Sequence, residues 1–523
     1  MSAVRGAAAI GSGLSPARDA RPIREGERIH VVGAAGAGAS AAALLAHAGG
    51  ATVSGCDRGG PSPYTAPLEA AGIHLDWAHD PSHVTLEPAP ERLAVTKALT
   101  AVDPDNPELA AARAASITLE PWQQVIADAA LGRFLVGVAG THGKSTTAGW
   151  LVHVLVESGL DPSAFVGALL PRSVTGGLPS TARTGRGSPF VVEADEYAGN
   201  FDAYRPNLAI LTSAEWDHPD VFADRQAVLT AFEAWLRRSP SGPRPPTLVA
   251  NVADPGVSIV VERLRNWPGL VCAVSLLADD RSLFDVAHRE ELSARFRTAR
   301  GPAQVLLGQT SEVGPAGALL AFAGRGTEPQ VFTSRIRLAG RHNAANALCV
   351  AGAAIQMAVS GDPLAAGLGS FGGVGRRLER KGEGRGVVVY DDYGHHPTAI
   401  RETLAALRQL EPGRRVWAVY EPLTYHRTAA MLNQFAEVLA TADAVAISDI
   451  WASRDPDTTV TSAAALAEAT ARIRPGLTAV APGSVERTAA WLAREVQAGD
   501  AVLVMGGGRS YRIAELLMEA LSD

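Results

Sequence analysis

The chain has little lysine, little cysteine and few aromatic residues. Only three of its 47 strongly basic residues are lysine, at positions 97, 144 and 381, and the formal net charge is −7. A negative balance without a long basic run argues against nucleic acid as a partner. The three cysteines lie far apart and form no CxxC pair, so the sequence indicates neither a disulfide framework nor a zinc site. No apolar run approaches the roughly 18 residues of a membrane span, so we expect no membrane partner.

The chain does contain enough apolar sequence for several domains. Hydrophobic residues make up 47% and charged residues 19% of its 523 residues, and about 150 residues per domain predicts about three domains. Apolar runs typical of buried strands alternate with helical patterns, as in doubly wound α/β domains. We expect a disordered tail (1–28), a Rossmann-like domain (29–131), a P-loop ATPase-like domain (132–364) and a second Rossmann-like domain (365–523). The tail lacks the apolar core of a signal peptide, so we expect a cytoplasmic protein.

The strongest motif is a glycine-rich turn between a predicted strand, 134–139, and a predicted helix that includes 150–156. The turn consists of Gly140, Thr141, His142, Gly143, Lys144, Ser145 and Thr146. Backbone N–H groups and the helix dipole hold a phosphate in such a turn, where a lysine neutralises it and the next hydroxyl can ligate Mg²⁺. The strict P-loop pattern has glycine where this chain has Val138, so the match is to a shortened form. The alternative is an ordinary helix cap, which does not explain a lysine in so lysine-poor a chain.

A second glycine-rich turn opens the first domain. Gly36 and Gly38 with Ala41 satisfy a G-x-G-x-x-A fingerprint. Asp57 follows the next strand about 20 residues on, the spacing expected of a ribose-binding acid. Alone, this pattern fits either a dinucleotide site or a tight structural turn. A nicotinamide-dependent dehydrogenase built on it would leave the phosphate turn unexplained.

Carboxylates follow two further predicted strands of the central domain. The first strand ends at Glu193, with Asp195 and Glu196 beyond it, and the second leads to Asp217 and His218. Oxygen ligands suit Mg²⁺, and a phosphate loop needs an acid to complete its metal site. A solvated strand end is the alternative for the carboxylates, and a structural histidine is the alternative for His218.

Two more polar clusters stand farther along the chain. Residues 341–346, Arg-His-Asn-Ala-Ala-Asn, open a helix of small residues, where they either cap the helix or bind a base or phosphate. A strand over 386–390 ends in Asp391-Asp392-Tyr393-Gly394-His395-His396-Pro397. A turn does not require two acids, a tyrosine and two histidines, so we interpret this second cluster as functional.

Taken in order, these motifs resemble those of the Mur ligases, ATP-dependent amide-bond formers of peptidoglycan precursor synthesis. The resemblance spans about residues 29 to 510. It implies an enzyme that activates a carboxylate as an acyl phosphate, which an amine then attacks. The segment Tyr425-x-Arg427-Thr428 is most similar to members that join L-alanine to UDP-N-acetylmuramate. The sequence around Glu193 and Tyr204 is also similar to recycling members that attach a tripeptide, and a non-catalytic nucleotide-binding relative is a further alternative.

The resemblance also implies roles for the motif residues. The first domain would bind the UDP part of the substrate through Gly33, Gly36, Gly38, Ser40 and Asp57. ATP would be bound by residues 140–146, His342, Asn343, Asn346, Arg377 and Asp391. Mg²⁺ would be held by Ser145, Glu193 and His218, and Lys144, Glu193 and His218 would act in catalysis. The incoming amino acid would be bound by Tyr393, His395, His396 and Arg427.

Three departures from the family pattern concern substrate choice. Residues 95–100 replace a serine-rich stretch near the UDP phosphates, and Glu421-Pro422-Leu423 stands where Gln-Pro-His is more usual. Arg509 and Ser510 follow a glycine triplet where an acid is common. Monomer and homodimer are both open from the sequence.

Overall fold

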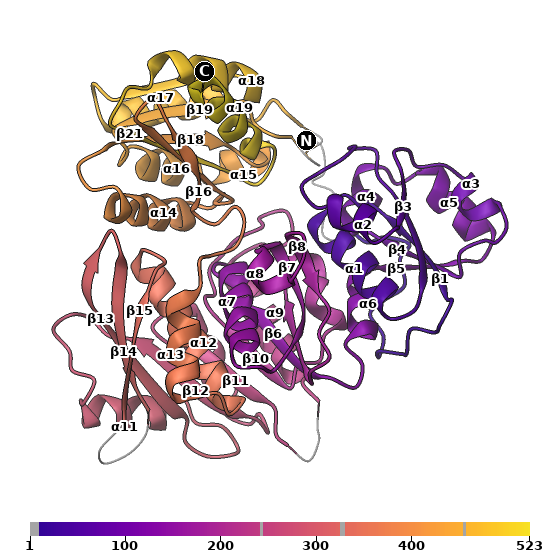
Figure 1. Cartoon of the computed structure of the whole chain (residues 1–523), viewed down its shortest axis with the longest axis horizontal. Coiled ribbons are helices and arrows are strands. Elements are labelled where there is room, and N and C mark those ends of the chain that lie inside the picture. The colour runs from indigo at the N-terminus through magenta and orange to yellow at the C-terminus, as the bar shows by residue number, and fades with distance from the viewer. Residues whose placement is uncertain (1–9, 241–243, 325–329, 453–454, 456, 523) are drawn as a thin grey trace.

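The computed structural model describes residues 10–240, 244–324, 330–452, 455 and 457–522, which form three domains, each built on one β-sheet (Figure 1). All three sheets have a parallel centre covered by helices, so the expected three-domain α/β class is confirmed. Among the described residues, no helix is long and apolar enough to cross a membrane.

The first domain contains a five-stranded parallel sheet in the order β3-β2-β1-β4-β5. Its strands are β1 (Arg28–Val32), β2 (Thr52–Cys56), β3 (His74–Asp76), β4 (Arg92–Val95) and β5 (Thr118–Pro121). Its helices are α1 (Ala37–Ala48), α2 (Ala66–Ala70), α3 (Ser82–Thr85), α4 (Lys97–Val102), α5 (Pro107–Ala114) and α6 (Trp122–Ala129). The strand order reverses direction between β1 and β4, and ligands of open α/β sheets bind beyond the carboxyl ends of strands at such a point.

The expected disorder of the whole tail is wrong from residue 10 onward, and residues 1–9 lie outside the described part. The Arg18 guanidinium donates to both carboxylate oxygens of Asp128, at 2.9 and 2.8 Å. The buried Arg92 already pairs with Glu27, Glu120 and Asp128. Three buried carboxylates need more than one cation, and the tail supplies Arg18. Ion pairing of this kind leaves no apolar pattern in the sequence.

The central domain contains a ten-stranded sheet in the order β15-β14-β13-β12-β11-β10-β6-β9-β7-β8, antiparallel at both ends. Its strands are β6 (Phe134–Ala139), β7 (Ser163–Leu170), β8 (Ser180–Arg183), β9 (Pro189–Glu193), β10 (Leu208–Leu211), β11 (Thr247–Asn251), β12 (Leu270–Leu276), β13 (Gln304–Gly314), β14 (Gly317–Ala323) and β15 (Val331–Ile336). Its helices are α7 (Lys144–Glu157), α8 (Arg172–Thr175), the 3₁₀ segment η2 (Tyr197–Ala203), α9 (Arg225–Arg237), α10 (Pro255–Arg263), α11 (Val286–Arg295), α12 (Arg341–Gln356) and α13 (Gly361–Ser370).

The expected boundary between residues 364 and 365 falls inside helix α13. This helix packs on α7 and β15, so it belongs to the central domain. The glycine-dense stretch 367–375 is therefore only in part a connection between the domains, because its first four residues are helical. Small residues serve here in close packing, since a Cβ on Gly367 would lie 3.1 Å from the Cα of Val154 on α7.

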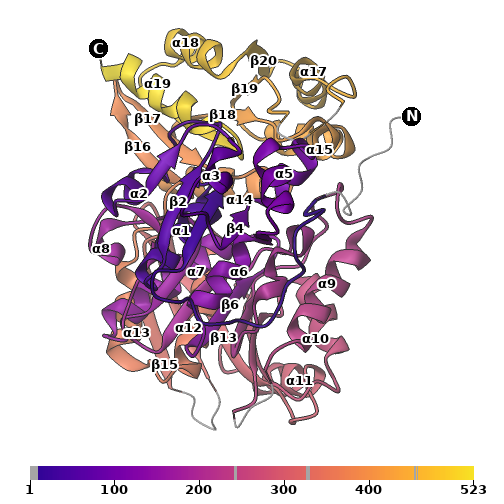
Figure 2. The same ribbon diagram turned by 90° about the vertical axis from the view of Figure 1, so that its right-hand side faces the viewer.

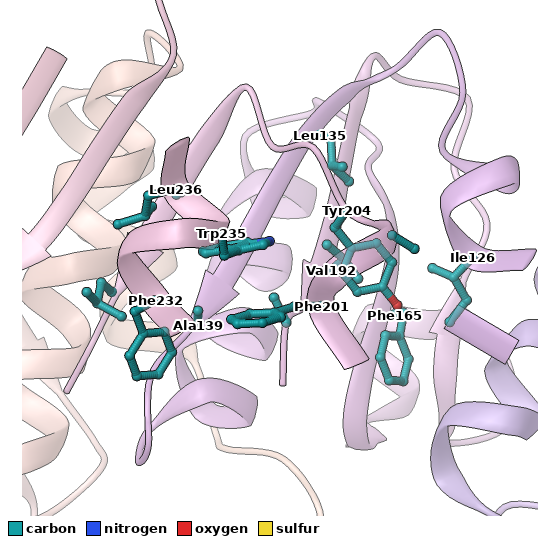
Figure 3. Close-up of a cluster of buried hydrophobic side chains, with 14 of the residues drawn as sticks. Ile126, Leu135, Ala139, Phe165, Val192, Phe201, Tyr204, Phe232, Trp235 and Leu236 are labelled. Carbon is teal, nitrogen blue, oxygen red and sulfur yellow. The ribbon is translucent and has the colours of Figure 1, made fainter. Parts of the chain in front are cut away.

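The hydrophobic core is continuous between the first and central domains (Figure 3). Phe201 of η2 stacks on Trp235 of α9, with ring centroids 5.2 Å apart. Toward the first domain, Phe165 of β7 meets the edge of Trp122 at the start of α6, at 5.3 Å. Because buried aromatic rings contribute much of the packing energy, this shared core fixes the first domain beside the carboxyl ends of β6 and β9.

The third domain contains a six-stranded sheet in the order β16-β17-β21-β18-β19-β20, with only β16 antiparallel to its neighbour. Its strands are β16 (Glu379–Gly384), β17 (Val387–Asp392), β18 (Arg415–Glu421), β19 (Ala444–Ser448), β20 (Thr478–Gly483) and β21 (Asp500–Gly506). Its helices are α14 (Pro397–Leu410), α15 (Tyr425–Ala430), α16 (Leu432–Leu439), α17 (Ala463–Ile473), α18 (Val485–Glu495) and α19 (Ser510–Ser522). Helix α14 lies against the central domain, where Gln409 bonds Gly314 and Gly340 (Figures 1 and 2).

Candidate active site

The glycine-rich turn after β6 lies where the three domains converge. Gly140 has φ 139° and Gly143 has φ 80°, a region in which residues with a Cβ are strained. A Cβ on Gly143 would lie 2.6 Å from the Asn346 side-chain oxygen, and one on Gly140 would lie 2.2 Å from the Thr212 hydroxyl. The turn therefore packs tightly against the end of β10 and against α12. This packing leaves the N-terminus of α7 facing the region between the domains.

Lys144, the first residue of α7, is held by two carboxylates. Its Nζ lies 2.9 Å from Glu196 and 3.3 Å from Asp195. Burial alone would lower the pKa of Lys144, but the charges of Glu196 and Asp195 raise it. The lysine is therefore a fixed cation at the start of a helix, and both features favour an anion beside it.

The three expected metal ligands are brought together only in part. The Ser145 hydroxyl donates to Glu193 at 2.9 Å, and the backbone N–H of Gly167 donates to the other Glu193 oxygen at 2.6 Å. His218 instead groups with Asp195 and Glu196, and the three offer ligand atoms within 4.8 Å of one another. The oxygens of this region suit a hard divalent cation.

Two cavities meet at the turn. The α12 cavity, about 490 Å³, lies beside the N-terminus of α12. The α1 cavity, about 400 Å³, lies beside the N-terminus of α1. His142, Gly143 and Arg377 line both, so the turn forms the wall between the two cavities. The Arg377 guanidinium reaches across from the third domain and donates to the Ser145 hydroxyl at 2.9 Å.

Most of the residues expected to bind ATP beyond the phosphate turn line the α12 cavity, namely His342, Asn343, Asn346 and Arg377. Asp391 does not. It is fully buried and accepts a hydrogen bond from Arg376 at 3.1 Å, whereas Asp392 lines the cavity. Successive strand residues point to opposite faces, and the sequence does not show which of two adjacent acids faces the ligand.

Residues expected in the first domain have different environments. Gly33 lies at φ 87° beyond β1, and Asp57 accepts hydrogen bonds from Ala35 N at 3.1 Å and Gly59 N at 2.7 Å. Gly38 lines the α1 cavity, and Gly36 precedes α1 as its N-cap. Ser40 is fully buried and lies 3.1 Å from the Thr181 hydroxyl of β8. The Ser40 hydroxyl therefore joins α1 to the central domain, and it does not face a ligand crevice as expected.

The residues expected around the amino acid meet at the third-domain side of the α1 cavity. Tyr393, His395 and His396 line it. His396 uses both ring nitrogens in the fold, since one caps Thr398 N at 3.2 Å and the other faces Trp216 O at 3.3 Å. His395 uses Nδ1 to donate to Tyr393 O at 3.0 Å, which leaves the lone pair of Nε2 available. Burial lowers the pKa of His395 well below its usual range, so the ring is neutral.

Arg427 is buried and paired with Asp217 of the central domain. Its guanidinium also lies 3.2 Å from Nδ1 of His218. Burial alone would raise the pKa of Asp217, but the charges of His218 and Arg427 hold it well below its usual range. An incoming carboxylate would therefore compete with Asp217 for Arg427.

Several residues at the site carried no assigned role in the sequence. Glu215 accepts from the Thr398 hydroxyl at 2.9 Å and lies 3.2 Å from His142 Nε2, so it links the phosphate turn to α14. Trp122 lines the α1 cavity opposite Gly38. From the sequence, a tryptophan at the start of an amphipathic helix is expected in the hydrophobic core. Only its position next to Gly38 in the structure shows that it lines a cavity.

Comparison with protein families gives three matches in chain order. They are described as "Mur ligase family, catalytic domain" over residues 28–133, "Mur ligase middle domain" over 138–354, and "Mur ligase, glutamate ligase domain" over 376–508. Together they cover most of the chain, and their limits agree with the three sheets.

Curated relatives match over nearly the full length. The UDP-N-acetylmuramate–L-alanine ligase of Kineococcus radiotolerans is 36% identical over 504 residues, which cover 95% of this chain and 96% of that protein. The enzyme of the same name from Frankia casuarinae is 34% identical over 515 residues, which cover 95% and 98%.

Two solved structures share the fold. UDP-N-acetylmuramate-alanine ligase of Thermotoga maritima has a TM-score of 0.72 at 22% identity, covering 94% of this chain and 98% of that one. A murein peptide ligase of Psychrobacter arcticus has a TM-score of 0.68 at 24% identity, covering 95% and 99%.

Proposed function

The chain belongs to the Mur ligase family, and we propose that it joins L-alanine to the carboxylate of UDP-N-acetylmuramate with hydrolysis of ATP to ADP and phosphate. Eight relatives at 32–36% identity carry this name. The observation that carries the proposal is the phosphate turn between two cavities, because the reaction needs a γ-phosphate to lie between a nucleotide and a carboxylate.

ATP occupies the α12 cavity in this proposal. Its phosphates follow Gly140–Thr146, and its base lies near His342, Asn343 and Asn346. Lys144 exchanges Glu196 and Asp195 for phosphate oxygens, and Arg377 reaches the same phosphates from the third domain. Fixed cations at these points stabilise the negative charge that spreads over the transferring group.

We further propose a Mg²⁺ site next to the turn. The Ser145 hydroxyl and Glu193 carboxylate are already hydrogen-bonded at 2.9 Å, and Asp195 lines the same cavity as Glu193. Such oxygens fit Mg²⁺, which in this position would neutralise phosphate charge. His218 fits less well as it stands, because its Nδ1 faces Arg427. It can serve as a ligand once Arg427 turns to another anion.

The UDP-sugar enters from the first domain. Gly33 and Gly36 shape the turn before α1, their N–H groups being bonded to the carbonyls of Cys56 and Gly33, while Gly38 lines the α1 cavity and Asp57 stands at the end of β2 for the ribose. The muramoyl carboxylate then lies in the α1 cavity, beside Lys144. One of its oxygens attacks the γ-phosphorus, the bond from that phosphorus to the β,γ-bridging oxygen breaks, and ADP leaves with the bond's electrons.

The amino acid completes the reaction on the other side of the α1 cavity. Its carboxylate takes Arg427 from Asp217, and Tyr393, His395 and His396 surround its amine. The neutral amine attacks the acyl carbon, the bond from that carbon to the phosphate oxygen breaks, and phosphate leaves. The amine's extra proton goes first to Nε2 of His395, which has a free lone pair on a fixed tautomer, and because the low pKa of this ring disfavours its charged form, the proton then passes to the departing phosphate.

The test measures phosphate release from ATP and Mg²⁺ with UDP-N-acetylmuramate and, in turn, L-alanine, glycine, L-serine or the cell-wall tripeptide. We expect release with L-alanine and a product heavier than the sugar nucleotide by one alanyl residue. Release with the tripeptide alone would move the function to recycling, which the fold shared with a murein peptide ligase makes the natural second candidate. Silence with every acceptor would contradict both.

A further inference from the structure

Five metal-binding side chains meet in the first domain, outside the site described above. His30 lies on β1, Cys56 ends β2, His83 lies on α3 and Glu108 on α5, and His79 lies in the loop between β3 and α3. Four of these side chains are at most 5% exposed, and that of His83 is 12% exposed. Buried groups of this kind need partners that satisfy their lone pairs and charge.

Their spacing fits one tetrahedral ion. Glu108 lies 2.9 Å from Nε2 of His30, 3.2 Å from Nδ1 of His83 and 3.2 Å from the Cys56 sulfur. One ligand atom from each of these four residues lies within 4.8 Å of the others. Ligands at about 2.0 Å (N, O) and 2.3 Å (S) from a tetrahedral Zn²⁺ are separated by roughly 3.3 to 3.6 Å. The distances from Glu108 are already close to this spacing, and separations of up to 4.8 Å among the other ligand atoms would shorten by at most about 1.5 Å to bring all four to bonding distance.

The contacts around the four donors are those of a metal site. Nδ1 of His30 lies 2.8 Å from the Ser54 hydroxyl, and Nε2 of His83 lies 3.4 Å from Asp76. Each imidazole thus has a partner on the nitrogen that points away from the cluster, which fixes its tautomer and ring orientation as in known metal centres.

Hydrogen bonding alone does not satisfy the cluster. Nε2 of His30 is buried, and despite its short distance to Glu108 it has no well-directed hydrogen bond to any described residue. The fully buried Glu108 has ion-pair contacts in the described structure only with His30, His79 and His83, which are neutral unless protonated. A buried carboxylate without a cation is costly. A divalent cation would supply that charge and would take up the free lone pair.

We propose that His30, Cys56, His83 and Glu108 bind one Zn²⁺ ion, with His79 as a neighbouring hydrogen-bond partner. Nitrogen and sulfur donors favour zinc over the Mg²⁺ of the phosphate site. The sequence indicated no zinc site because the ligands come from four separate elements and form no local motif.

In this proposal the ion stabilises the carboxyl end of β2, next to the turn at which the UDP part of the substrate is proposed to bind. The carbonyl of Cys56 accepts the N–H groups of Gly33 and Ala34, at 2.8 and 3.0 Å, and Asp57 is the next residue. Fixing the Cys56 side chain therefore also fixes the glycine turn and the acid beside it. Metal binding of this kind stabilises the folded state, because the unfolded chain has no preformed site.

The test loads the full-length protein with Zn²⁺ or Co²⁺ and measures metal content and absorption. We expect about one zinc per chain and, with Co²⁺, a near-ultraviolet thiolate-to-cobalt charge-transfer band. The bound zinc and the cobalt band should both be lost in Cys56→Ala. In His83→Ala the zinc content and the intensity of the band should both fall at least about fivefold. Cys349→Ala, which removes another buried thiol, should keep both. The other two clusters of possible metal ligands in the described residues contain no cysteine, so the band reports this site alone.

A second measurement does not depend on variants that fold poorly. A zinc chelator should lower the melting temperature of the wild-type protein by several degrees, and added Zn²⁺ should restore it. Wild-type protein without zinc and without a cobalt–thiolate band would overturn the proposal, as would zinc bound equally well by Cys56→Ala. These readouts are independent of ligase activity, so they stand or fall separately from the proposed reaction.

Discussion

The phosphate turn of the central domain and the glycine triplet of the third domain share one local geometry but differ in what lies at the helix start. In both, a parallel strand runs through glycines into a helix, from β6 to α7 and from β21 to α19. The start of α7 opens on two cavities and carries Lys144. The start of α19 is already filled, because the buried Glu421 carboxylate accepts the Ser510 N–H at 2.6 Å. A glycine-rich turn therefore indicates an anion-binding site only when no side chain of the protein already accepts the N–H groups at the start of the following helix.

The largest effect should come from removing the charge at the open turn. Lys144→Ala should lower kcat about 10³-fold, because the lysine stabilises charge that grows on the transferring phosphate. The steady-state rate of phosphate release measures this. Lys381→Ala is the matched control, since Lys381 pairs with Glu379 on β16, away from both cavities. Equal losses in the two variants would mean that Lys144 acts only through general electrostatics.

Two adjacent histidines differ in the same way: His395 has a ring nitrogen with a free lone pair, whereas both ring nitrogens of His396 have partners within the protein. His395→Gln should lower kcat about 10²-fold and leave the KM for ATP unchanged, because it removes the one imidazole with a free lone pair at the acceptor. His396→Gln should mainly lower the melting temperature, since both nitrogens of His396 hold the start of α14. Rate measurements at saturating L-alanine test this. A larger kcat loss in His396→Gln would reverse the assignment.

The Glu421 carboxylate at the start of α19 makes the free energy of unfolding depend on pH. Burial raises the pKa of Glu421 from its ordinary value near 4.5 to about 7. The folded state therefore binds a proton that the unfolded state releases, and stability falls as pH rises from about 4.5 to 7. A shift of this size corresponds to about 3 kcal/mol.

Glu421→Gln keeps the acceptor oxygen and removes the titration. We expect the variant and the wild type to have similar stability at pH 4.5, and the variant to be more stable at pH 8 by up to about 3 kcal/mol. Urea unfolding at the two pH values measures the difference. Glu411→Gln, at a partly exposed acid that receives a hydrogen bond from Tyr390, is the control. A gain that is the same at both pH values would exclude titration of Glu421 as the cause.

The glycine turn of the first domain lies between these extremes, because an aromatic ring covers it. A Cβ on Gly38 would lie 2.2 Å from the Trp122 ring, whereas one on Gly36 would come no nearer than 3.4 Å to its closest neighbour, Gly33 O. Gly38→Ala must displace Trp122 from the α1 cavity, a strain of about 1–3 kcal/mol. We expect the KM for UDP-N-acetylmuramate to rise about tenfold in Gly38→Ala and to change little in Gly36→Ala. An unchanged KM in Gly38→Ala would mean that the ring's position does not matter for binding.

The sequence predicted the elements well because their signals are local. Apolar runs, glycines and the lone lysine of the turn identify β6, α7 and the phosphate loop without tertiary information. The orientation of a side chain is not local. The sequence does not show which of Asp391 and Asp392 faces the cavity, because that depends on how the sheet packs. The segment around Arg18 is held in place by ion pairs with buried carboxylates of β5 and α6, which lie about 100 residues farther along the chain. The proposed zinc ligands are close only because the strand order places β1 beside β2, with α3 and α5 over them.

Ser40 shows the smallest expected effect and the clearest distinction between a ligand and a structural contact. The resemblance to the Mur ligases implies that Ser40 contacts UDP, yet its hydroxyl is buried against Thr181 of the central domain. Ser40→Ala should lower stability by about 1 kcal/mol, the usual value of a buried hydrogen bond, with no change in the KM for UDP-N-acetylmuramate. Thr181→Val should have a similar effect, and the double variant should lose less than the sum, because either change removes the same bond. A raised KM in Ser40→Ala at unchanged stability would instead restore the serine to the ligand site.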